Sequence, residues 1–344
     1  MKLYVMLAFR RVAPAPNEVL VELFETLARR GHTLEIGIAE ELIMSPQLLQ
    51  PKHDLYLLKS HAPLWLSLAG ILHAQGARLL NPFLGCRALQ DKLLTARALR
   101  EGGIPAPVSW VTGDLQRLQA IAAEHPLIIK PFDGRRAEGI RVVRNPLELA
   151  GVPEPERPVL VQQFVPNDGM DLKLYVVGSE VFGVRKPSPL LRERGPGERC
   201  AVNESVRKIA LRCGELFNLS LYGVDLVEGP DGPVVVDVNY FPSYRTIPGA
   251  AALIADRIDL MLRTTGGTLN GRGRPQTDDG YGSAIWPAGE VSPRDAAPVD
   301  RGRAPLPAVV AQVSSGDVKP REKSRPVAVS RTLAGAPPSE CPVP

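Results

Sequence analysis

The sequence is short of the residues that build zinc sites, disulfide frameworks and stacking surfaces. Its four cysteines lie far apart and form no CxxC pair, which argues against zinc binding and against a disulfide framework. The five histidines are scattered without metal-ligand spacing. Aromatic residues make up 5% of the chain, too little for platforms on which the bases of a single nucleic-acid strand would stack.

The chain also lacks a long apolar run. No stretch of about 18 or more apolar residues occurs, which argues against a membrane span. The first strand begins at Lys2, and no charged, apolar and small-residue pattern indicates a signal peptide, so the cytoplasm is the expected location. The net charge of +4 is compatible with an anionic substrate but does not single out nucleic acid.

The remaining sequence predicts two folded regions and a tail. Strands and helices alternate over residues 1–84, which predicts a small parallel α/β domain. Residues 85–263 mix runs of strands with helices and predict an α+β body. Over residues 264–344, Gly, Pro, Ser and Arg dominate and apolar periodicity ends, so we expect a disordered tail.

Residues 222–248 carry the most functional information. Two valine-rich runs, Gly223–Glu228 and Val234–Tyr240, flank a cluster of Gly, Pro and Asp, a pattern typical of a β-hairpin. If the loop takes the five residues 229–233, Asp225 lies opposite position 237. A four-residue loop would instead place the two carboxylates on opposite faces.

Three oxygen-bearing side chains stand on this predicted hairpin. Asp237 and Asn239 are two residues apart on one strand and therefore share a face. Asp225 and Asp237, about 5 Å apart, repel each other unless a cation lies between them. A hard dication with oxygen ligands, Mg²⁺ (or Mn²⁺), is the natural candidate. For Asp-x-Asn alone, an ordinary hairpin with solvated acids would be the preferred interpretation.

Basic residues upstream suggest a polyphosphate site. Lys130 ends the apolar strand LIIK and precedes a loop bounded by glycine, where its ammonium and nearby backbone amides can approach phosphate oxygens. Lys92 is a second candidate cation. Taken alone, Lys130 is better explained as a surface lysine before a hairpin loop, and Lys92 can equally be a solvated helix residue.

The next strands add further polar residues. The strand at 159–165 breaks at Pro166, which leaves backbone groups to pair with an adenine edge. Asp171 and Lys173 share a face of the following strand, and Arg185 ends the strand after it. The alternative is cross-strand ion pairing, which contributes less than about 1 kcal/mol where it is exposed.

Taken in order, these motifs resemble the ATP-grasp superfamily over most of residues 85–262. The resemblance implies a nucleotide lid at about 93–158 and a metal-site subdomain at about 159–263. It also implies that Mg-ATP is bound by phosphate-contacting lysines, an adenine-contacting hinge, a nucleotide-contacting acid and magnesium ligands. Lys92 and Lys130 match the phosphate-contacting lysines, and Gln163, Phe164 and Val165 match the hinge. Asp171 matches the nucleotide-contacting acid, and Asp225, Asp237 and Asn239 match the magnesium ligands.

Two branches of the superfamily are similar to this chain. RimK-type amino-acid ligases resemble the D-x-K, VVGSEVFGVRK and hairpin segments, whereas inositol polyphosphate kinases of the ATP-grasp kind resemble QQFV, LKLYVVG and DVNYFPSY. Arg10, Arg11 and Lys59 fall near places where those kinases have basic substrate contacts. The chain departs from the kinases in having Asn167-Asp168-Gly169 for His-Gly-Gly, and from many ATP-grasp proteins in having Gln163 for the hinge acid.

The leading hypothesis is a ligase that activates a carboxylate as an acyl phosphate and joins it to an amine on an amino-acid or peptide-like substrate. Arg185, expected to contact the acyl phosphate, and Lys173 are its candidate catalytic residues. The second hypothesis is a kinase acting on a polyol phosphate gripped by Arg10, Arg11 and Lys59. A nucleotide-binding module without turnover is the third. Neither nucleic acid nor a membrane is expected as a partner.

Overall fold

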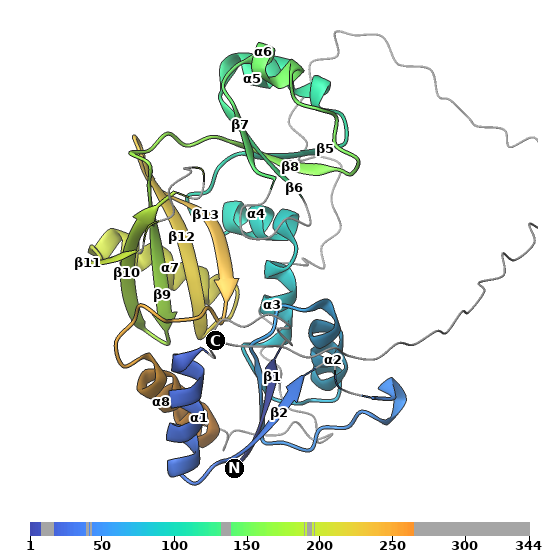
Figure 1. Ribbon diagram of the computed structural model, residues 1–344, viewed down its shortest axis with the longest axis vertical. Coiled ribbons are helices and arrows are strands. Elements are labelled where there is room, and N and C mark those ends of the chain that lie inside the picture. Colours follow the sequence, from blue (N-terminus) through green and yellow to red (C-terminus); the bar gives the residue numbers. More distant parts are fainter. Residues whose placement is uncertain are drawn as a thin grey trace, which may run out of the picture. The chain divides into compact units, whose positions relative to one another are not determined.

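The computed structural model describes residues 1–7, 17–38, 41, 43–131, 139–188, 190, 195 and 197–264. Its N-terminal part is a parallel four-stranded sheet of order β2-β1-β3-β4 with flanking helices (Figure 1). The elements are β1 (Lys2–Leu7), α1 (Glu18–Arg29), β2 (Thr33–Ile38), η2 (Pro46–Leu48), β3 (Leu55–Leu58), α2 (Pro63–Ala74) and β4 (Leu79–Leu80). The central strands β1 and β3 are almost wholly buried, as expected of apolar strands covered on both faces. The predicted parallel α/β architecture is confirmed.

A pair of short helices leads out of this sheet. The helices are α3 (Phe83–Leu89) and α4 (Lys92–Glu101). Asp91 separates them, because its carboxylate accepts hydrogen bonds from the backbone amides of Leu93 and Leu94 at 2.9 and 3.1 Å. This N-cap starts a new helix and makes Lys92 its first residue.

The next part is a small antiparallel sheet of order β5-β8-β6-β7. Its elements are β5 (Ser109–Thr112), η3 (Leu115–Leu118), α5 (Gln119–Glu124), β6 (Leu127–Pro131), β7 (Arg141–Val143), α6 (Pro146–Ala150) and β8 (Val159–Gln163). It has a hydrophobic core of its own around Leu127, Leu149 and Val161. Because β8 belongs to this sheet, the subdomain boundary expected near residue 158 does not coincide with a sheet boundary.

The third part is an antiparallel five-stranded sheet of order β11-β10-β9-β12-β13. Its strands are β9 (Met170–Val177), β10 (Glu180–Pro187), β11 (Glu198–Cys200), β12 (Leu221–Gly229) and β13 (Gly232–Tyr240), and its helices are α7 (Glu204–Leu216) and α8 (Ala250–Arg263). Helix α7 packs against β9 and β12, and α8 packs against β9 and α1 (Figure 1).

One continuous cluster of buried apolar residues joins the N-terminal sheet to the five-stranded sheet. Leu3, Leu57, Leu174 and Val224 all belong to it and are fully buried. The boundary expected near residue 84 therefore runs through a shared core. Among the described helices, none is long and apolar enough to cross a membrane. The tail expected from residue 264 onward lies outside the described residues, except for Thr264 itself.

Candidate active site

The β12–β13 hairpin sets the register of the site. A two-residue turn pairs Gly229 with Gly232, and a ladder that stayed regular from there would place Asp225 opposite Val236. A β-bulge between Asp225 and Leu226 shifts the register so that Asp225 pairs with Asp237. The predicted pairing is confirmed, but the predicted five-residue loop is wrong. The single extra residue in β13 restores the alignment that the short turn would have lost.

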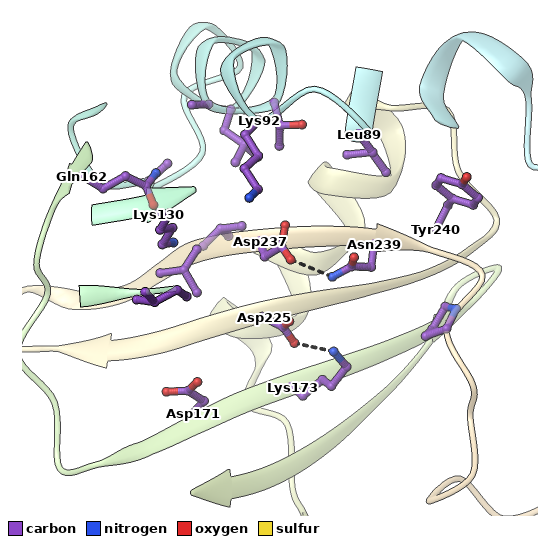
Figure 2. Close-up of a pocket in the computed structure, with 18 of the residues that line it drawn as sticks. Leu89, Lys92, Lys130, Gln162, Asp171, Lys173, Asp225, Asp237, Asn239 and Tyr240 are labelled. Carbon is purple, nitrogen blue, oxygen red and sulfur yellow. Dashed lines mark hydrogen bonds and ion pairs between the residues drawn. The ribbon is translucent and has the colours of Figure 1, made fainter. Parts of the chain in front are cut away.

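Three charged side chains form a row across neighbouring strands. Lys173 on β9 pairs in register with Asp225 on β12, which pairs in turn with Asp237 on β13. The ammonium of Lys173 lies 2.7 Å from Oδ1 of Asp225, as Figure 2 shows. Although burial favours the neutral amine, the charge and hydrogen bond of Asp225 raise the pKa of Lys173. The row therefore carries one positive and two negative charges on one face of the sheet.

Asn239 completes the predicted metal-ligand set. Its Nδ2 donates a hydrogen bond to Oδ2 of Asp237 at 2.9 Å (Figure 2), so its Oδ1 takes no part in that bond. Asp237 is open to the cleft but flanked by protein. This desolvation, together with the Asp225 charge, raises the pKa of Asp237. Two carboxylates that disfavour each other's charge are the setting in which a bound cation is stabilising.

The donor set fits magnesium better than a transition metal. Among the described residues, no three or more His, Cys, Asp or Glu side chains gather as a metal site. What the hairpin offers is two carboxylates and one amide oxygen, from Asp225, Asp237 and Asn239. Magnesium is usually held by one or two carboxylates, with substrate phosphates and water filling its octahedral shell.

These residues line a cleft of about 750 Å³, a size typical of small-molecule sites. Both predicted phosphate lysines reach it: Lys92 starts α4, and Lys130 lies on β6 (Figure 2). The ammonium of Lys92 donates to the backbone oxygen of Pro131 at 2.7 Å. Burial lowers the pKa of Lys130, Asp237 opposes that shift and the Lys92 charge adds to it. An anionic ligand between these lysines would compensate both charges. The loop at 132–138 lies outside the described residues.

One end of the cleft is apolar. Its wall includes Ala106 and Pro107. The residues on either side of this pair tie the segment to two sheets: the backbone oxygen of Pro105 accepts from Val235 on β13, and that of Val108 accepts from Gln163 at the end of β8, at 2.8 and 2.9 Å. The other apolar side chains lining the cleft include Ala96, Leu99, Ile140, Leu160, Val235 and Val236, whereas Leu89 lies on the side of Tyr240 (Figure 2). Such a slot suits the faces of a flat ring.

The structure does not bring the three predicted hinge residues into the cleft. The amides of Gln163 and Phe164 donate to the backbone oxygens of Val108 and Pro126, and neither residue nor Val165 is among the described residues that line it. Gln162 lines it instead, 5% exposed. The sequence VLVQQ offered no signal for this choice, because β8 is buried along most of its length and does not alternate between polar and apolar residues.

Asp171 lies at the floor of the cleft and is 8% exposed. Burial raises its pKa, an effect that a hydrogen bond with Ser188 opposes and the charge of Asp225 reinforces. Asp171 pairs in register with Lys186, which also lines the cleft. A carboxylate and an ammonium thus face the ligand space from neighbouring strands.

The other end of the cleft reaches the N-terminal sheet. Lys59, His61 and Tyr240 line it, and Lys59 donates to the backbone oxygen of Phe241 at 2.8 Å. His61 stacks on the ring of Tyr240 with centroids 3.9 Å apart. Its Nε2 donates to the backbone oxygen of Tyr240 at 2.9 Å, which leaves Nδ1 to accept from Gln90 at 3.2 Å. No sequence pattern indicated His61 or Tyr240 as site residues.

Arg185 does not join the site. It pairs in register with Leu172, whose side chain faces away from the cleft, and it forms ion pairs with Asp168 at 2.7 Å and Glu228 at 3.7 Å. Its neighbour Lys186 faces the cleft in its place. Arg10 and Arg11, the other predicted substrate contacts, lie outside the described residues.

Comparison with known proteins identifies the kind of domain that carries this cleft. Residues 89–253 match the model of the RimK-like ATP-grasp domain. A probable alpha-L-glutamate ligase 2 from Shewanella sp. (strain MR-4) is 26% identical over 192 residues, which cover 52% of this chain and 64% of that protein.

Solved structures show the same fold. A RimK-domain ATP-grasp protein from Sphaerobacter thermophilus has a TM-score of 0.61 at 24% identity, covering 75% of this chain and 99% of that one. The ATP-grasp ligase PsnB, solved with a variant of its minimal precursor, Mg and ADP, has a TM-score of 0.55 at 18% identity, covering 75% and 97%. The fold is therefore that of ATP-grasp proteins.

Proposed function

Because residues 89–253 form a RimK-like ATP-grasp domain, we propose that this protein is a Mg-ATP-dependent ligase that joins a carboxylate to an amine. The observation that supports this most is the shared cleft: the row Lys173–Asp225–Asp237 and the amide of Asn239 face the same space as Lys92 and Lys130. Carboxylates for a metal and ammoniums for phosphates are the two requirements of phosphoryl transfer from ATP.

Within this proposal, the residues divide along the cleft. The base lies in the apolar slot, and the small sheet that carries Gln162 and Lys130 is the nucleotide lid. Lys92 and Lys130 bind the phosphates. Asp225, Asp237 and Asn239 would hold Mg²⁺, which supplies charge compensation to the phosphates. Lys173 and Lys186 add fixed positive charge on the neighbouring strands, the role that the sequence assigned to Arg185.

The reaction has two displacements. A carboxylate oxygen of the substrate attacks the γ-phosphorus of ATP, and the bond to ADP breaks, which gives an acyl phosphate and ADP. The amine nitrogen then attacks the acyl carbon; inorganic phosphate leaves and the nitrogen loses a proton. The lysines of the cleft stabilise both steps, because their positive charge is already in place where the transferred phosphoryl group carries negative charge.

We propose an acidic amino acid as one substrate. The relative from Shewanella carries the name alpha-L-glutamate ligase, and Lys59 adds positive charge at the end of the cleft away from the apolar slot. A second carboxylate on the substrate would be attracted to this end. The other substrate, an amino acid or a peptide, enters from the same side.

Oxygen-18 labelling tests the reaction class. The full chain is incubated with Mg-ATP, an amine acceptor and an amino acid whose carboxylates carry ¹⁸O. A ligase transfers one labelled oxygen to free phosphate and forms an amide only when both substrates are present. A parallel incubation contains an inositol phosphate in place of the amino acid and the amine; there a kinase would produce ADP and a stable phosphorylated product without labelled free phosphate. That second outcome would contradict the ligase.

A further inference from the structure

We propose that the hydroxyl of Tyr175 binds the carboxylate of the amino-acid substrate that is not activated, and thereby selects substrates with two carboxylates. The proposal rests on the ligase function proposed above and adds a specificity-determining residue to the same cleft. It is carried by one nearly buried hydroxyl, by the wall on which it stands and by the charges around it.

Tyr175 is the third cleft-facing residue of β9. Asp171, Lys173 and Tyr175 alternate along this strand with buried apolar residues and all line the cleft; Figure 2 shows the first two. Residues on a strand advance about 3.3 Å each, so Tyr175 lies about 7 Å beyond Lys173, on the side away from Asp171. Tyr175 therefore stands beyond the row that Lys173 forms with Asp225 and Asp237.

The hydroxyl of Tyr175 has no hydrogen-bond partner among the described residues, although the residue is only 8% exposed. Its oxygen is not one of the fully covered unpartnered atoms, so the exposed part includes the hydroxyl. The ring is held on two sides: Tyr244 packs against it with centroids 5.8 Å apart, and Nζ of Lys173 lies 5.8 Å from its centroid. Buried polar groups are nearly always hydrogen-bonded, so a ligand in the cleft is the expected partner of this fixed hydroxyl.

The row of the sheet that contains Tyr175 has an apolar middle. Tyr175 pairs in register with Gly223 on β12, which pairs with Asn239 on β13. Gly223 contributes no side chain, and Pro242 packs over it, with Cγ 3.5 Å from the place that a Cβ would take. Pro242 also lines the cleft. This wall is therefore apolar between two polar groups, Tyr175 and Asn239, which suits the methylene groups of an amino-acid side chain.

The polar groups at this end favour an anion. Among the described residues that line the cleft, the carboxylates are Asp171, Asp225 and Asp237, and none of these lies beyond the row of Lys173. Beyond that row the cleft is lined by an ammonium, a histidine ring and neutral polar groups, from Lys59, His61, Tyr175, Asn239, Tyr240 and Ser243. Positive charge in a cleft attracts an anion, and a hydroxyl donates a strong, short hydrogen bond to a carboxylate. The carboxylate that is activated has to meet the γ-phosphate beside the metal ligands, so the one at Tyr175 is the second.

Hydroxamate formation tests the proposal, because the nitrogen of hydroxylamine attacks the acyl carbon of an acyl phosphate and phosphate leaves. The full chain is assayed with Mg-ATP, hydroxylamine and one carboxylate at a time. The carboxylates are L-glutamate, L-norvaline, which keeps only the α-carboxylate, and 4-aminobutanoate, which keeps only the side-chain carboxylate. The wild type should use L-glutamate at least about 10-fold more efficiently, by kcat/KM, than either monocarboxylate, as expected for a hydrogen bond to a charged group.

Tyr175→Phe removes the hydroxyl and keeps the ring. It should raise the KM for L-glutamate about 10-fold or more. The kcat and the KM for ATP should stay within about twofold, because the lost contact is made equally in the ground state and the transition state. The kcat/KM values for both monocarboxylates should also stay within about twofold. The matched control, Tyr4→Phe, removes a hydroxyl from a residue of β1 that is equally buried, at 9% exposure, and does not line the cleft; it should behave as wild type.

An unchanged KM for L-glutamate in Tyr175→Phe would overturn the proposal. So would a loss of efficiency shared by the monocarboxylates or by ATP, which would show a structural role. Failure of the ligase proposal gives a different result: no hydroxamate forms with any carboxylate. Equilibrium binding of L-glutamate with Mg²⁺ and a non-hydrolysable ATP analogue then decides the role of Tyr175, which requires binding to the wild type and at least about 10-fold weaker binding to Tyr175→Phe. Absence of binding to the wild type would overturn it.

Discussion

Lys173 places its ammonium 2.7 Å from the carboxylate of Asp225 on the adjacent strand, in register with it. Both side chains are mostly buried, at 15% and 21% exposure. The pair supplies one cation to a site whose two carboxylates would otherwise repel each other. Lys173 therefore stabilises the metal-free arrangement of Asp225 and Asp237 in addition to facing the cleft.

Replacing Lys173 by methionine tests this role. The variant Lys173→Met should lower the free energy of unfolding by about 2 kcal/mol in the absence of metal, because Asp225 loses a charged hydrogen bond. Saturating Mn²⁺ should recover part of the loss. Denaturant unfolding with and without Mn²⁺ measures both. Lys208→Met, which removes an exposed helical ion pair with Glu204, is the control, with an expected change below about 0.5 kcal/mol. A loss that Mn²⁺ leaves unchanged would contradict the assigned role.

Asp237→Asn should lower the rate of ADP formation at least about 100-fold, since one metal-binding carboxylate becomes neutral with almost no change in shape. Steady-state release of ADP with Mg-ATP and both substrates provides the measurement. Asp231→Asn makes the same chemical change at the exposed turn of the same hairpin and should keep full activity. Equal turnover in the two variants would show that the metal site is wrongly assigned.

Asp259 should stabilise the protein in a pH-dependent way. Its carboxylate accepts hydrogen bonds from Arg30 and His32, each at 2.7 Å, and so ties α8 to the end of α1 and the start of β2. Burial alone would raise its pKa, but these hydrogen bonds lower it below the ordinary value of 3.8. The stability it contributes is therefore present above about pH 3.8 and lost as pH falls through the depressed pKa.

The test compares Asp259→Asn with wild type. At pH 7 the variant should unfold with about 1–2 kcal/mol less free energy, and this gap should close as pH falls toward 2. Asp256→Asn removes a more exposed partner of Arg30, with 65% of its side chain accessible, and should cost less. A gap that stays constant down to pH 2 would exclude the proposed ion pairing.

Gly85 should not tolerate a side chain. It lies in α3, and an added Cβ would overlap the backbone oxygen of Phe217, just after α7. Gly85→Ala should cost about 2–3 kcal/mol, because backbone on both sides has to move. Gly151→Ala places its Cβ no closer than 3.5 Å to any neighbour and should change stability by less than about 0.5 kcal/mol. Thermal unfolding of both variants distinguishes steric overlap from a general effect of losing glycine.

The hairpin was predictable from the sequence because its strands are valine-rich and its acids alternate with apolar residues. The cross-strand pairing of Asp225 with Asp237 was predicted correctly, but from a loop of the wrong length. A bulge is not visible in the pattern, since the residue it adds, Val236, only lengthens the run of valines that begins at Val234. Only the register of the paired strands shows that turn and bulge together give the same alignment.

Gln163 and Arg185 show more clearly what the sequence alone could not predict. Each stands beside a residue of similar chemistry, Gln162 or Lys186, and neighbours on a strand face opposite ways. The sequence indicates that a glutamine and a basic residue serve the cleft, but choosing the member of each pair requires knowing which face is covered. In β8 and β10 that is decided by packing against other parts of the chain.

Because Gln162 and Lys130 project from one face of the same small sheet, with their spacing fixed by the ladder between β6 and β8, any rigid-body swing of that sheet carries both together. Under the proposed function, a nucleotide would then meet the apolar slot and the ammonium of Lys130 in a single motion of the sheet.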